Sequence, residues 1–155
     1  MKNKYYIMKN IFLNKGDIEY VLNEGHTLLH KALISFIYST GLDNEQIMDL
    51  KISDLIYACY NYLDDASEDS VDNLLNLNPS EVFPCWVFDK EPPIQIIYNT
   101  PETTEYLFSY LKDKKRYSNI SSTDYLFSTY LKTKDKNEGS AIQLKKDYIN
   151  KVLSR

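Results

Sequence analysis

A glycine turn between two segments of helical periodicity constrains the fold of this chain most. Before the turn, apolar side chains recur at spacings of three and four residues, at Leu28, Leu29, Ala32, Leu33, Phe36 and Ile37. This spacing places them on one face of a helix, and Gly41 suits the end of that helix because glycine adopts the left-handed conformation readily. Asp43 and Asn44 can then cap the N-terminus of a following helix. The sequence therefore predicts two helices that share a core across a tight turn.

Start signals for further helices recur along the chain. Proline favours the first helical position, and Ser, Thr and Asn favour the position before it. We expect helices to start near Asn14, Ser53, Ser70 and Thr100-Pro101, and a last amphipathic helix over Leu144–Leu153. Residues 112–119 are expected to form a polar loop, 124–127 a short buried segment and 132–140 a charged loop.

Two β-prone runs, 82–88 and 94–98, flank a turn that contains Pro92 and Pro93, and this pattern predicts a hairpin. The fold class expected is α+β, mostly helical with a small antiparallel hairpin. We expect residues 11–155 to form a single domain, preceded by an N-terminal extension over 1–10.

Composition excludes several classes of protein. Of the 155 residues, 43% are hydrophobic and 26% are charged, as in globular domains. No apolar run approaches the length of a membrane helix, and the first ten residues lack the apolar segment of a signal peptide. We expect a cytoplasmic protein without membrane contact or cofactor. Cys59 and Cys85 lie far apart without metal-ligand spacing, so we expect reduced, buried thiols.

The net charge of −4 conceals an asymmetry along the chain. Residues 1–109 contain 7 Lys/Arg and 17 Asp/Glu, a net of −10, whereas residues 110–155 contain 11 Lys/Arg and 5 Asp/Glu, a net of +6. A basic region can bind phosphates even in an acidic chain. A solvated basic face remains the alternative.

The segment Thr40-Gly-Leu-Asp43, with Gln46 and Leu50 after it, resembles the first catalytic box of the tyrosine recombinases, the phage-integrase family. That box usually reads Thr-Gly-Leu-Arg-x-x-Glu-x-x-x-Leu. Lys90 in the hairpin turn matches the family's lysine position, with Glu91 in place of the usual threonine. Thr100-Pro-Glu102, Asp124-Tyr-Leu-Phe127 and the 144–153 segment follow in the family's order, so the resemblance spans about residues 10 to 155.

The resemblance implies an integrase-like fold and a role in DNA integration or recombination, in a phage or mobile element. In that chemistry a tyrosine attacks a phosphodiester, arginines hold the phosphate and a lysine protonates the leaving oxygen. Asp43 stands at the first arginine position, where a carboxylate would repel the phosphate. The second box, His-x-x-Arg, and the nucleophilic tyrosine would lie beyond Arg155. We therefore expect a degenerate or truncated form that does not recombine DNA by itself.

Each candidate site residue also has a simpler interpretation. Lys90 is read as an exposed turn lysine, and Asp43 with Asn44 as a helix cap. His26 and His30 are spaced for a metal, but no third ligand is evident. The acidic run over 64–72 lacks the EF-hand pattern, and the 14 tyrosines are read as core residues rather than base-stacking platforms.

Two functions are therefore expected. In the first, an integrase-like protein binds DNA phosphates through Lys112, Lys114, Lys115, Arg116, Lys132, Lys134 and Lys136. In the second, a repurposed recombinase scaffold docks a protein partner through its acidic region, with another copy or another recombinase subunit as candidate partners. An unrelated enzyme is disfavoured because no catalytic constellation supports it.

Overall fold

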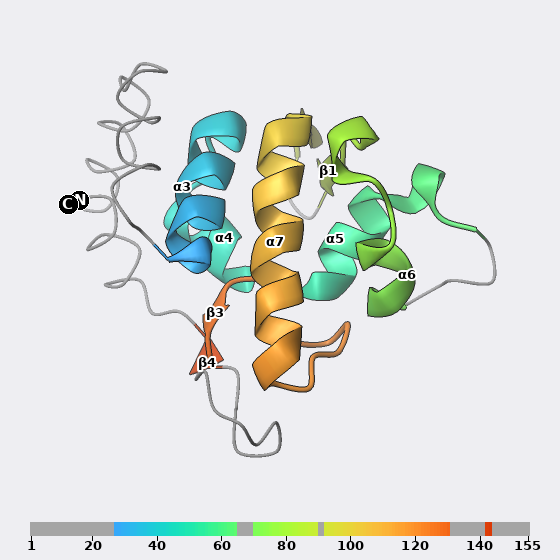
Figure 1. Ribbon diagram of the computed structural model, residues 1–155. Helices are drawn as coiled ribbons and strands as arrows, with labels where there is room; N and C mark the ends of the chain where they lie inside the picture. Colours follow the sequence, from blue (N-terminus) through green and yellow to red (C-terminus); the bar gives the residue numbers. More distant parts are fainter. Residues whose placement is uncertain (1–26, 65–69, 90–91, 131–141, 144–155) are drawn as a thin grey trace.

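The computed structural model describes residues 27–64, 70–89, 92–130 and the backbone of 142–143. Over these residues the protein is mostly helical with small two-stranded antiparallel sheets, which confirms the α+β expectation at that level. Helix α7 (Pro101–Tyr117) stands at the centre, with α3 (Leu28–Thr40) on one side and α5 (Ile52–Ala58) and α6 (Val71–Leu75) on the other (Figure 1). None of the described helices is long and apolar enough to span a bilayer.

Helix α3 begins and ends where the sequence predicts. The Thr27 hydroxyl accepts a hydrogen bond from the backbone N–H of His30 at 3.2 Å. Gly41 has φ of 68° and donates its N–H to the Ile37 carbonyl at 2.9 Å. A residue with a side chain would be strained in this left-handed conformation, so the glycine sets where the helix stops.

Helix α4 (Asn44–Asp49) opens with a reciprocal cap. The Asp43 carboxylate accepts the Gln46 N–H at 2.9 Å, and the Gln46 side chain accepts the Asp43 N–H at 3.2 Å. The cap interpretation of Asp43 is confirmed. Ile47 and Leu50 are buried in the core.

The predicted cap of α5 at Ser53 is wrong, because the helix begins at Ile52 and Lys51 precedes it. Asp54 accepts the Lys51 N–H at 2.8 Å. The Ile52 and Ser53 N–H groups donate instead to the carbonyls of Asp124 and Ser122, at 2.9 and 2.8 Å. Carbonyls distant in the sequence thus accept hydrogen bonds from the first backbone N–H groups of α5, which a capping side chain would otherwise accept.

Short elements connect α5 to the sheet. A 3₁₀ turn, η1 (Tyr60–Tyr62), follows α5, and α6 is capped by Ser70, as predicted, through a 3.2 Å bond from the Asn73 N–H. A second 3₁₀ turn, η3 (Pro79–Glu81), packs on α7 before the hairpin begins.

The predicted hairpin is confirmed as β1 (Cys85–Phe88) paired antiparallel with β2 (Gln95–Tyr98). Trp86 lies opposite Ile97 and faces the core. Its ring packs edge-on against the ring of Phe36, with 5.2 Å between the two ring centres. Its indole N–H donates to Asn99 Oδ1 at 2.7 Å. The same amide donates to the Thr104 hydroxyl at 3.0 Å, which ties the hairpin to α7.

Helix α7 starts with the Thr100 cap and Pro101, as predicted, but it continues through Tyr117. The prediction of a loop over 112–119 is therefore wrong for 112–117. Lysine and arginine are good helix formers, and the Ser118 N–H donates to the Lys114 carbonyl at 2.9 Å where the helix ends. Leu126 and Phe127 are buried beyond α7, whereas Asp124 and Tyr125 are half-buried, so the expected buried segment over 124–127 is confirmed for its second half.

A small ladder closes the fold beside the end of α7. Strand β3 (Ser128–Thr129) pairs antiparallel with β4 (Ile142–Gln143). The core lies between α3, α5, α7 and the inner face of the hairpin. Its largest fully buried apolar side chains include Phe36, Phe108, Phe127, Leu33 and Leu107.

Candidate functional site

The exposed stripe of α7 changes charge along its length. Glu102, Glu105, Ser109, Lys112 and Arg116 recur at helical spacing and are all exposed. The acidic residues lie near the helix N-terminus and the basic ones near its C-terminus. This order stabilises the helix, because each charge interacts favourably with the nearer end of the helix dipole. Lys112 and Arg116 are thus the predicted phosphate-binding residues that the structure places at the surface.

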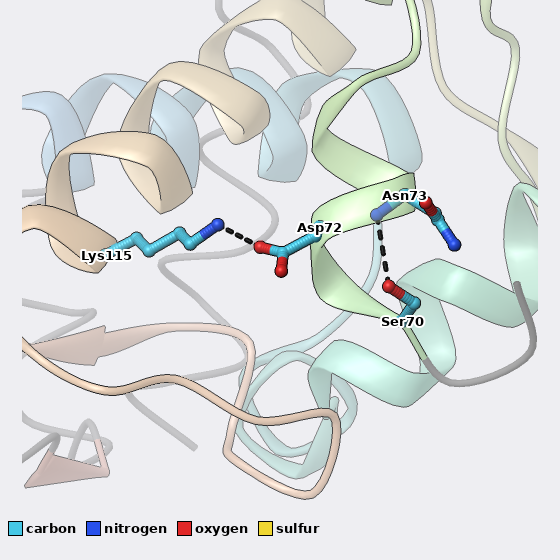
Figure 2. Close-up of polar contacts among 4 residues, drawn as sticks. All are labelled: Ser70, Asp72, Asn73 and Lys115. Carbon is cyan, nitrogen blue, oxygen red and sulfur yellow. Dashed lines mark hydrogen bonds and ion pairs between the residues drawn. The ribbon is translucent and has the colours of Figure 1, made fainter.

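Lys115 lies beside this stripe but is already engaged. Its ammonium forms an ion pair with the Asp72 carboxylate of α6, and both side chains are partly exposed (Figure 2). Exposed pairs of this kind contribute at most about 1 kcal/mol. Asp72 therefore holds Lys115 toward α6 and lowers the positive charge at this end of α7.

Lys114 does not belong to the exposed basic surface, and the prediction that it contacts phosphate is corrected here. Its side chain is 0% exposed, and its ammonium donates a hydrogen bond to the Ser128 hydroxyl. It also lies 5.9 Å from the centre of the Tyr110 ring. Burial lowers the pKa of Lys114 to about 8, and the nearby charge of Asp124 opposes this shift. Helical periodicity turns this lysine inward while its neighbours Lys112 and Arg116 turn outward.

The Lys114 contacts form part of a buried polar cluster that sequence reasoning missed. The Tyr110 hydroxyl accepts the Ser128 N–H at 2.9 Å and lies 2.9 Å from the Leu126 carbonyl, to which it donates. The cluster fixes the segment after α7 against the helix. A tyrosine and a lysine four residues apart on a helix share one face, and this spacing is the signal that was available.

Of the other residues predicted from the family resemblance, Asp43 caps a helix and the rest lie outside the described residues. Asp43 is exposed and serves the α4 cap, so its carboxylate is held at the N-terminus of a helix. Lys90, Lys132, Lys134 and Lys136 lie outside the described residues, as does His26. Among described residues, no group of three or more His, Cys, Asp or Glu side chains could hold a metal ion.

The two thiols differ in environment. Cys59 is buried, as predicted, and burial raises its pKa to about 12. Cys85 is only half-buried, on β1 opposite Tyr98, so the expectation of burial is wrong for this residue. A side-chain hydrogen bond with Cys85 is the largest cause that raises the pKa of Tyr98.

A polar hollow adjoins the Lys115–Asp72 pair. It has a volume of about 370 Å³, and the loop residues Ser118, Asn119, Ser121 and Ser122 contribute to its lining. Ser118 itself is almost fully buried. Asp72 and Lys115 themselves contribute to the lining of this hollow.

Sequence reasoning also missed an apolar surface on the outer side of the hairpin. Val87, Ile94, Ile96 and Tyr98 are all exposed. Ile94, Ile96 and Tyr98 alternate with Gln95 and Ile97, and this period of two was the signal available. The expectation that the tyrosines are core residues holds for Tyr110, but it is wrong for the exposed set Tyr38, Tyr57, Tyr60, Tyr62 and Tyr98.

Comparisons of the chain with known protein families, with curated proteins and with solved structures found no match. Its function is therefore inferred from the placement of its own residues and from the motifs of its sequence.

Proposed function

We propose that this chain is an integrase-like DNA-binding protein that holds the phosphate backbone through the C-terminal end of α7 and does not cut the strand itself. The observation that carries the proposal is the exposure of Lys112 and Arg116 one helical turn apart, near the C-terminal end of α7. The ordered motifs of the tyrosine recombinases, from Thr40-Gly-Leu42 to Asp124-Tyr-Leu-Phe127, add support from the sequence.

The negative charge of Asp43, at the family's first arginine position, supports a protein that binds DNA without cleaving it. Arginine holds a phosphate through a fork of donors, whereas Asp43 brings a negative charge and is occupied as a cap. Loss of one such donor costs about 3 to 4 kcal/mol of transition-state stabilisation. A purified chain that forms a covalent adduct with a nicked duplex substrate would contradict this part of the proposal.

DNA binding is tested by fluorescence anisotropy with a labelled duplex at several salt concentrations. Each phosphate contact contributes about 0.9 to the slope of log K against log salt. Replacing Lys112 and Arg116 together by glutamine should weaken binding and lower that slope by about 2.

Replacing Lys31 and Lys51 together by glutamine is the matched control for this test, because it removes two positive charges from α3 and from the start of α5 rather than from α7. The control should bind like the wild type. Failure of the wild type to bind even at low salt, or equal loss in the control and in the α7 variant, would contradict the assignment.

A second function, docking of a protein partner on a recombinase-like scaffold, is favoured by the exposed apolar surface of the hairpin. Large apolar patches at the surface of a small domain are typical of interaction sites. Two further exposed aromatic residues, Phe83 and Tyr62, lie together, because the Phe83 N–H donates to the Tyr62 hydroxyl at 3.3 Å.

A further inference from the structure

The outer face of the hairpin is apolar and open to solvent. Side chains on this face belong to Cys85, Val87, Ile94, Ile96 and Tyr98, which we call the hairpin face. Ile94, Ile96 and Tyr98 are 66%, 59% and 60% exposed. The register confirms a common side, since Cys85 lies opposite Tyr98 and Val87 opposite Ile96. The other side of the same strands carries Trp86 and packs into the core.

The stretch of sequence that contains the hairpin is acidic. Between Lys51 and Lys112 the sequence contains 11 Asp/Glu and a single basic residue, Lys90. Among the described residues of that stretch, Glu81 lies just before the hairpin and Asp89 directly after β1, and both are exposed. A partner that covers this face must therefore combine apolar side chains with positive charge.

The chain itself contains a region with that chemistry. Residues 132–155 contain 7 Lys/Arg and 3 Asp/Glu. Their apolar positions Leu144, Tyr148 and Val152 recur every four residues in the sequence, a pattern typical of an amphipathic helix. Lys112 and Arg116, at the exposed end of α7, belong to the same basic part of the chain.

We propose that the hairpin face of one copy binds the basic 110–155 region of a second copy. Two hairpin faces would instead bring like charges together, which is unfavourable across an interface. The contact is heterologous, because the two surfaces that meet are different, so in a pair one copy retains a free basic region and the other a free hairpin face. This inference rests on the second proposed function and supplies its partner.

Salt distinguishes this contact from a face-to-face dimer. Sedimentation equilibrium of the full chain should show a mass that rises with protein concentration at low salt. The mass should fall toward that of the monomer at about 0.5 M salt, because screening weakens attraction between opposite charges. Association that strengthens with salt, or a monomer throughout at low salt, would overturn the proposal.

Two variants test which surfaces meet. The face variant carries Ile96→Ser and Tyr98→Ser, both at exposed positions. The basic-region variant carries glutamate in place of Lys112, Lys145, Lys146 and Lys151. Each should be a monomer alone, yet an equal mixture should form a dimer and nothing larger, since only one intact surface of each kind remains. A mixture that stays monomeric would overturn the proposal.

Tyr38→Ser is the matched control, because it removes an exposed tyrosine from α3 and leaves the hairpin unchanged. It should associate like the wild type. Far-UV circular dichroism and thermal unfolding of all the variants separate a lost contact from a lost fold.

Crosslinking from a photoreactive amino acid at position 96 distinguishes a wrong choice of partner from the absence of any docking function. In cells that express the chain, irradiation should give a crosslink between two copies, mapped by mass spectrometry to residues 110–155. Crosslinks to other proteins alone would overturn the second-copy partner while leaving a docking function. No crosslink at all would contradict both.

Discussion

The ammonium of Lys114 donates a hydrogen bond to the hydroxyl of Ser128 inside the protein, where both side chains are fully buried. This contact joins the last turns of α7 to β3. A buried lysine is costly because its charge loses hydration, and that cost is expressed in its pKa of about 8.

Replacing Lys114 by methionine should therefore raise stability at pH 7. The charged form is disfavoured in the folded state, whereas the unfolded chain retains the usual pKa of 10.5. Between those values the unfolded state binds more protons, so the contribution of Lys114 to stability rises with pH from about 8 to about 10.5. The advantage of Lys114→Met, up to about 3 kcal/mol below pH 8, should shrink over that window.

Urea unfolding of both proteins at pH 7, 8, 9 and 10 checks this prediction through the difference between them. The difference removes the contribution of other groups, such as Cys59, whose raised pKa lowers stability above pH 9 in both proteins. If the stability advantage of Lys114→Met over the wild type grew as pH rises, Lys114 would be shown to stabilise the fold through its charge.

Loss of the α4 cap should have a measurable cost. Asp43→Ala removes the acceptor for the Gln46 N–H and should lower the free energy of unfolding by about 1 kcal/mol. Asp43→Asn should retain most of the stability that the cap provides, because asparagine caps helices as well as aspartate does. Urea unfolding measures both changes, and equal losses in the two variants would mean that the negative charge, rather than the cap, stabilises this corner.

The buried Asn99 amide should be critical for the hairpin. Asn99→Ala leaves the Trp86 indole N–H without its acceptor and removes the bond to Thr104. An unsatisfied buried donor costs about 1 to 3 kcal/mol. Urea unfolding should show a loss of this size, together with a shifted Trp86 fluorescence maximum. Asn76→Ala, at an exposed position, is the control and should change neither measurement.

Release of Lys115 should strengthen DNA binding. Asp72→Asn breaks the ion pair with Lys115 and exposes an additional positive charge beside Arg116. Because exposed pairs are worth at most about 1 kcal/mol, the gain in affinity should be about twofold to fivefold. Anisotropy titration measures it. Glu81→Gln is the control for loss of one negative charge elsewhere, and an equal gain there would point to net charge alone.

The two cysteines should react at different rates with a thiol reagent. Cys85 is half-buried at the hairpin face, whereas Cys59 is buried with a pKa of about 12 and so is almost wholly protonated at pH 8. One thiol should titrate in the folded protein and the second only after unfolding. Cys85→Ser should remove the fast phase, and a fast phase that survives would assign the reactivity to Cys59.

The sequence by itself determined the features that depend on neighbouring residues. Gly41, Asp43, Ser70 and Thr100 mark helix ends because each acts on backbone groups within four residues of itself. The hairpin follows from two β-prone runs across a turn for the same reason. Core positions with strict helical spacing, such as Leu33 and Phe36, were equally predictable.

Only the tertiary structure decided which polar groups are buried and which apolar groups remain exposed. Helix α5 begins before Ser53 because carbonyls from 122 and 124 bind its first amides. Lys114 lies inside because Ser128 and Tyr110 meet it there, and Tyr98 lies outside because no described element covers that face of the hairpin. Such outcomes depend on residues far apart in the chain, whose contacts no local pattern encodes.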